Sequence, residues 1–88
     1  MQNFPETSPL FYGLPSRVHL VELGENRIGI RKVIKSRIIQ KDAAKIIEIA
    51  TQIKNVNPEL ELTLICTPNI CSKSLNLLES EGIGVEFV

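Results

Sequence analysis

The sequence predicts a small α/β (α+β-like) protein with the element order β-β-α-β-α-β. Alternating apolar side chains, typical of strands, occupy residues 17–23, 27–34, 60–67 and 84–88. Residues 36–55 and 70–80 instead repeat apolar side chains every three or four positions, as helices do. The strand–helix–strand–helix–strand order after a hairpin requires right-handed crossovers. We therefore expect a four-stranded mixed sheet packed with two main helices.

Length and composition limit the protein to one small domain. The chain has 88 residues, of which 43% are hydrophobic and 23% are charged, as in ordinary globular proteins. Two cysteines are too few for a disulfide scaffold or a structural zinc site. No apolar run approaches the roughly 18 residues of a membrane span, and the first residues have no signal-peptide pattern. We expect a cytoplasmic protein that does not contact membranes.

The first 16 residues are expected to form an extended, proline-rich arm before a single domain at residues 17–88. Pro5, Pro9 and Pro15 disfavour a helix or a central strand there. The segment is nevertheless apolar, which predicts packing on the domain or on a neighbouring subunit; its apolar residues are Phe4, Leu10, Phe11, Tyr12 and Leu14. Because a core this small gains much from added burial, we expect a homodimer or a larger protein partner.

The next two runs, 17–23 and 27–34, predict a hairpin. They are joined by Gly24-Glu25-Asn26, a turn sequence. Gly29 lies in the middle of the second strand, where a glycine indicates a bulge or a close approach of other atoms.

The segment 36–55 predicts the longest helix. Ser36 is its candidate N-cap, and Asn57-Pro58 ends it. One face is apolar and should contact the sheet; it consists of Ile39, Ala43, Ile46, Ala50 and Ile53. Lys41, Lys45 and Lys54 should face water.

The last three elements predict a second crossover. Residues 60–67 alternate at first and then become apolar on both faces, as a buried strand does. Residues 70–80 form a short predicted helix with Gly82 as its C-terminal cap, and 84–88 form the last strand.

The net charge of zero hides a strong segregation along the chain. Residues 26–54 hold eight lysines and arginines against Asp42 and Glu48, whereas residues 55–88 hold Lys73 against five glutamates. Such a block predicts a basic surface that could face phosphates, or a solvated pair of elements balanced by acidic neighbours.

Few residues show a catalytic pattern. The chain lacks a glycine-rich phosphate loop, and Cys66 and Cys71 are too far apart for a CxxC redox pair. Cys66 is predicted to be a core residue, and Cys71, at a helix N-terminus, could have a lowered pKa. His19 has no partner that would make a nucleophile–base pair and is expected on the polar face of its strand.

Two runs carry a family resemblance. VHLVELGENRIGIRKVIKSRI combines a hairpin with the start of a helix, and LTLICTPNICSKSLNLLESEGIGVEF forms a strand–helix–strand unit. Together, from Val18 to Val88, they resemble the second half of the restriction-endonuclease-like, PD-(D/E)xK, nuclease superfamily. The resemblance implies a nuclease-like topology, an acid on the first strand, and an E-x-K motif on the second. In that family the carboxylates hold magnesium and the lysine stabilises charge on the attacked phosphate.

This chain departs from the family at the chemical positions. The first acid corresponds to His19 and the glutamate of E-x-K to Val33, while Lys35 matches. Imidazole and an aliphatic side chain do not replace hard oxygen ligands. We therefore expect a degenerate nuclease-like domain with no catalytic residues, no cofactor and no metal site.

Three hypotheses follow. The first is a non-catalytic binding or assembly module that contacts nucleic acid through a basic set consisting of Arg27, Arg31, Lys32, Lys35 and Arg37. The second is a magnesium-dependent nuclease that uses Glu22 and Lys35. The third is a purely structural homo-oligomeric protein.

Overall fold

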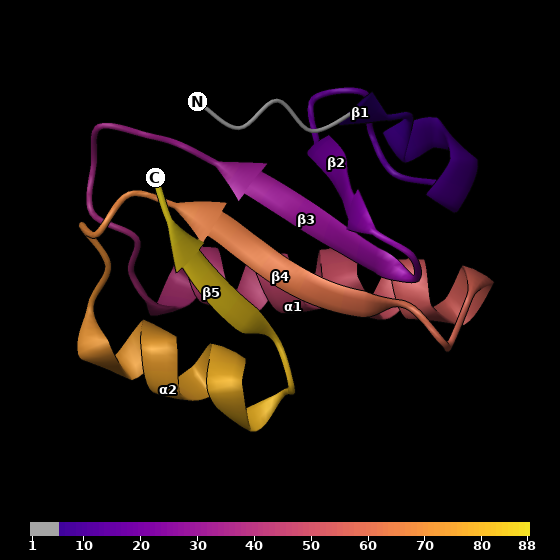
Figure 1. Cartoon of the computed structure of the whole chain (residues 1–88). Coiled ribbons are helices and arrows are strands. Elements are labelled where there is room, and N and C mark those ends of the chain that lie inside the picture. Colours follow the sequence, from indigo (N-terminus) through magenta and orange to yellow (C-terminus); the bar gives the residue numbers. More distant parts are fainter. Residues whose placement is uncertain (1–5) are drawn as a thin grey trace.

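A computed structural model describes residues 6–88 and confirms the predicted order of elements (Figure 1). None of the helices within these residues has the length and apolar character needed to span a bilayer. The elements, in chain order, are β1 (Glu6–Thr7), the 3-10 helix η1 (Pro9–Tyr12), β2 (His19–Gly24), β3 (Arg27–Lys32), α1 (Gln40–Val56), β4 (Glu61–Cys66), α2 (Ser72–Ser80) and β5 (Gly84–Phe87).

The four predicted strands form a mixed sheet, to which β1 adds a short edge strand. The strand order is β1-β2-β3-β4-β5, and the β1–β2 and β2–β3 pairs are antiparallel. Strands β3, β4 and β5 are parallel, with Lys32 opposite Cys66 and Cys66 opposite Phe87. The carboxyl ends of these three strands therefore lie side by side at one edge of the molecule (Figure 1).

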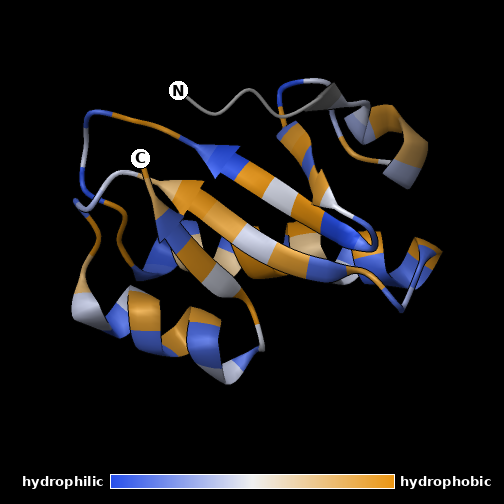
Figure 2. Ribbon diagram, in the orientation of Figure 1, coloured by the Kyte–Doolittle hydropathy of each residue, from blue (hydrophilic) through white to orange (hydrophobic). Residues whose placement is uncertain are grey.

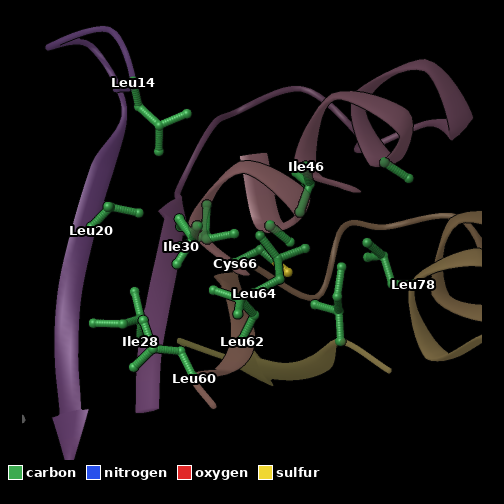
Figure 3. Packing of buried hydrophobic residues seen from close by; sticks show 14 of the residues in the cluster. Leu14, Leu20, Ile28, Ile30, Ile46, Leu60, Leu62, Leu64, Cys66 and Leu78 are labelled. Carbon is green, nitrogen blue, oxygen red and sulfur yellow. The ribbon is translucent and has the colours of Figure 1, made fainter. Parts of the chain in front are cut away.

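One apolar core joins both helices to one face of the sheet (Figure 3). Ile28 and Ile30 of β3 belong to the same buried cluster as Leu64 of β4 and Leu78 of α2. Strand β4 is buried from Leu62 to Cys66, so its end is apolar and buried on both faces, as predicted. Figure 2 shows the strand as hydrophobic over most of its length. The predicted apolar face of α1 is confirmed for its four buried residues, which are Ala43, Ile46, Ala50 and Ile53. Lys41, Lys45 and Lys54 are exposed, as predicted.

The start of α1 differs from the prediction. Ser36 is not the N-cap; the helix begins at Gln40, and the side chain of Asp42 accepts a 3.1 Å hydrogen bond from the backbone N–H of Ile39. The backbone just before the helix is extended, because Ile38 forms a parallel bridge with Ile70, at the end of the loop before α2. This pairing turns the Ile39 side chain outward, so that 49% of it is exposed and its predicted contact with the sheet is wrong.

On the face of the sheet away from the helices, neighbouring side chains cover Gly29. A Cβ atom at this position would lie 2.7 Å from Cδ1 of Ile65 and 2.9 Å from Cγ2 of Val21. Both neighbouring side chains are buried, yet neither belongs to the cluster beneath the helices. The predicted close approach at Gly29 is confirmed, whereas the bulge of the hairpin lies between Glu22 and Gly24.

The segment before β2 is folded onto α1 rather than fully extended. Pro9 occupies the start of η1, where its missing N–H costs no helical hydrogen bond. Tyr12 and Leu14 are buried in the core cluster, and the side-chain amide of Gln52 donates a 2.9 Å hydrogen bond to the carbonyl of Tyr12. Phe11, by contrast, is 72% exposed. Phe4, also assigned to the arm, lies outside the described residues.

Candidate functional site

A hollow of about 830 Å³ lies where β2 and β3 stop pairing. Their last paired residues are His19 and Arg31. Beyond this pair the chain segments 13–18 and 32–34 diverge, and α1 closes the space between them. The lining residues therefore place the hollow at the carboxyl end of β3. The long loop to α1 departs from the same end of the strand (Figure 1).

The interior of the hollow is aliphatic. Ile30 and Ile46 line it as fully buried parts of the core cluster. Val18, Ile34 and Ile49 also line it and are half-buried, so their outer surfaces remain available for contact. An exposed apolar surface of this kind is favourable to cover, because its removal from water releases free energy.

Cations surround this aliphatic interior. Arg17 comes from the segment before β2, Arg31 and Lys32 from the end of β3, and Lys45 from α1. Glu48 is the one acid among the described residues that line the hollow. Cations drawn from three separate elements around one hollow favour an anionic ligand.

Positive and negative side chains are separated along the direction of the parallel strands, and the hollow lies at the positive end. Apart from Arg27 and Lys54, the lysines and arginines lie at or near the carboxyl ends of the strands; they are Arg17, Arg31, Lys32, Lys35, Arg37, Lys41, Lys45 and Lys73. The amino ends are acidic instead, with Glu25 before β3, Glu59 and Glu61 at the start of β4, and Glu79 and Glu81 before β5. Three acids, Asp42, Glu48 and Glu86, also lie towards the carboxyl ends but are outnumbered by the cations there, so the neutral chain folds into a molecule with one net basic and one net acidic end.

The structure brings together most of the predicted basic set. Arg31 and Lys32 line the hollow, and Lys35 and Arg37 follow in the loop between β3 and α1. Arg27 lies at the opposite end of β3, where its Nε atom is 4.0 Å from Oε2 of Glu61.

Arg17 and Lys45 were not among the predicted contacts, although both line the hollow. The position of Arg17 could have been predicted from the hairpin, because in an antiparallel pair the start of β2 must lie beside the end of β3. Lys45 had no such signal, because its place beside the hollow depends on the packing of α1.

The positions that the resemblance assigns to carboxylates also lie at this hollow. His19 and Val33 both line it, and Lys35 is exposed two residues further along. Glu22 lies elsewhere, opposite Ile28 near the amino end of β3. From Ile28 to the end of β3 is about 13 Å, since a strand rises about 3.3 Å per residue. Within residues 6–88 no group of three or more His, Cys, Asp or Glu side chains is placed to hold a metal ion.

The two cysteines lie outside the hollow. Cys66 is a buried core residue, as predicted, and burial raises the pKa of its thiol. Cys71 is the N-cap of α2, and its sulfur lies 2.9 Å from the hydroxyl oxygen of the buried Ser74. Hydrogen bonds with the side chain and the backbone of Ser74, with a smaller contribution from the charge of Arg37, lower the pKa of the Cys71 thiol. Its bond to Ser74 gives Cys71 a structural role at the start of the helix.

The chain matches no protein-family model, no curated protein and no solved structure. The resemblance to PD-(D/E)xK nucleases therefore stays a prediction that depends on the order of elements and on the two sequence runs.

Proposed function

We propose that this protein is a non-catalytic binding module that contacts nucleic acid through its basic end. The observation that carries the proposal is the concentration of cations around the hollow, drawn from the segment before β2, the end of β3, its following loop and α1. A phosphate backbone is a regular array of negative charge, and several cations on one surface can contact it at once. The acidic opposite end would orient the molecule so that the basic end approaches first.

We propose binding without catalysis because the described residues at the hollow do not include the carboxylates that cleavage requires. Phosphodiester cleavage with magnesium needs carboxylate oxygens beside the attacked phosphate. His19 and Val33 occupy the positions that the resemblance assigns to those acids. The nuclease alternative must use Glu22, which lies at the far end of β3 from Lys35. The geometry therefore favours binding over cleavage.

Fluorescence anisotropy with a labelled oligonucleotide tests the proposal. If about six cations contact phosphates, the logarithm of affinity for duplex DNA should fall with the logarithm of salt concentration at a slope of about −5. Lys35→Glu should weaken binding by several-fold, and the matched control Lys54→Glu, at the acidic end, should change it by less than about twofold. Binding that is absent at low salt, or equally weakened by both variants, would contradict the proposal.

A nuclease assay addresses the alternative. We expect no cleavage of DNA or RNA with magnesium or manganese. Cleavage that disappears in Glu22→Gln would favour the nuclease instead.

A further inference from the structure

We infer that the hollow receives unpaired nucleotides, so that the protein prefers single-stranded nucleic acid to a duplex. The inference rests on the proposed function and deepens it. The proposed function needs only the cations of the basic end. The preference for a single strand needs the aliphatic interior that those cations surround.

The interior of the hollow offers nothing to a duplex. A double helix presents phosphates and sugars on its outside and keeps the faces of its bases stacked within. Val18, Ile34 and Ile49 expose aliphatic surface inside the hollow, which phosphates do not cover favourably. An unpaired base has a free apolar face and can cover this surface.

The arrangement of charges matches a strand that crosses the hollow. Arg17 lies in the segment before β2, Lys32 at the end of β3 and Lys45 on α1, so cations from three different elements line the hollow. A flexible single strand can place successive phosphates against such cations and turn a base inward, as proteins that bind single strands do with a charged groove and an apolar platform. Because nucleic acid carries both the anionic and the apolar part in each nucleotide, it fits both features together.

The size of the hollow agrees with this occupant. Its volume of about 830 Å³ lies within the range of about 300–1,000 Å³ typical of pockets that hold small organic ligands. The aliphatic walls contain no aromatic side chain among the described residues that line them, so we expect a preference of modest size.

The experiment compares one labelled strand with the blunt duplex formed from it. Wild-type protein should bind the single strand about five- to tenfold more tightly than the duplex at the same salt concentration. Val33→Asn is the first variant, because Val33 lines the hollow and is 45% exposed, so its replacement leaves the core intact. It should lower single-strand affinity several-fold and leave duplex affinity unchanged.

A matched pair on α1 gives a second readout. Ile49 and Ile47 are both half-buried, but Ile49 lines this hollow and Ile47 lines a separate, small one. Ile49→Asn should reduce the preference for the single strand, whereas Ile47→Asn should preserve it. Thermal melting of both variants shows whether each remains folded at the assay temperature.

The outcomes separate this inference from the proposed function. Equal affinity for single strand and duplex, with Lys35→Glu weakening both, would overturn the inference and leave the proposed function intact. Absence of binding to either nucleic acid would overturn both. Polyglutamate that competes as well as the single strand, charge for charge, would also overturn the inference and indicate an acidic protein partner.

Discussion

The carboxyl and amino ends of the parallel strands differ in both charge and packing. At the carboxyl end, cations surround a hollow of about 830 Å³, whereas at the other end of α1 the space beside Lys54 and Glu81 measures about 50 Å³. The acidic end is the one where the turns before β3, β4 and β5 are located. The difference shows that a chain with no net charge can still have a strongly basic surface, because the parallel strands bring distant residues to the same end.

The largest expected effect contrasts the two ends within α1. Ile53→Ala should lower the free energy of unfolding by about 2–5 kcal/mol, because Ile53 is fully buried and its loss leaves a closed cavity. Ile46→Ala should fall within the same range of about 2–5 kcal/mol, but below Ile53→Ala, because the space left can open into the hollow. Urea unfolding measures both.

Ile39→Ala is the control for this contrast. Because Ile39 is half exposed, its truncation should cost less than about 0.5 kcal/mol. If Ile46→Ala lowered the free energy of unfolding as little as Ile39→Ala, the core beside the carboxyl ends of the parallel strands would not contribute to the stability of the fold.

Gly29 lies midway along β3, between the two ends, and a substitution there tests how tightly the side chains on the face away from the helices are packed. Gly29→Ala should cost about 1–3 kcal/mol, because the added Cβ meets Ile65 and Val21 on the face that the helices do not cover. Gly84→Ala is a suitable control on β5, since the added Cβ would lie 3.4 Å from its nearest neighbour, the hydroxyl oxygen of Thr63. Similar losses for the two variants in urea unfolding would mean that the side chains over Gly29 move aside freely.

Charge reversal tests whether binding depends on the basic end. Arg31→Glu combined with Lys35→Glu should weaken nucleic-acid binding by at least about tenfold and flatten its salt dependence, because two phosphate contacts become repulsive. Isothermal titration at two salt concentrations measures both quantities. An unchanged salt slope would place the contact elsewhere on the molecule.

The smallest expected effect concerns self-association, which we propose through the exposed side chains of η1. Leu10 and Phe11 are 67% and 72% exposed beside the buried Tyr12. Phe11→Ser should shift a homodimer towards monomer in sedimentation at high micromolar concentration, with little change in the melting temperature. Deletion of residues 1–14 is unsuitable, because it removes Tyr12 and Leu14 from the core. Wild-type protein that sediments as a monomer would contradict this proposal.

The sequence by itself determined the order of elements and the buried face of α1. Ala43, Ile46, Ala50 and Ile53 are spaced by the helical repeat, and β4 is apolar on both faces; both patterns are local, so a single segment reveals them. The predicted close approach at Gly29 had the same local origin.

Contacts between distant segments decided the rest. The pairing of Ile38 with Ile70 moved the start of α1 from Ser36 to Gln40, and the direction of β3 separated Arg27 from Lys35. The hollow itself required segment 13–18, the end of β3 and one face of α1 to meet. A periodic pattern predicts which side of an element is buried, but where two elements meet depends on the packing of the whole core, and for that reason Arg17 and Lys45 became part of the candidate site only in the tertiary structure.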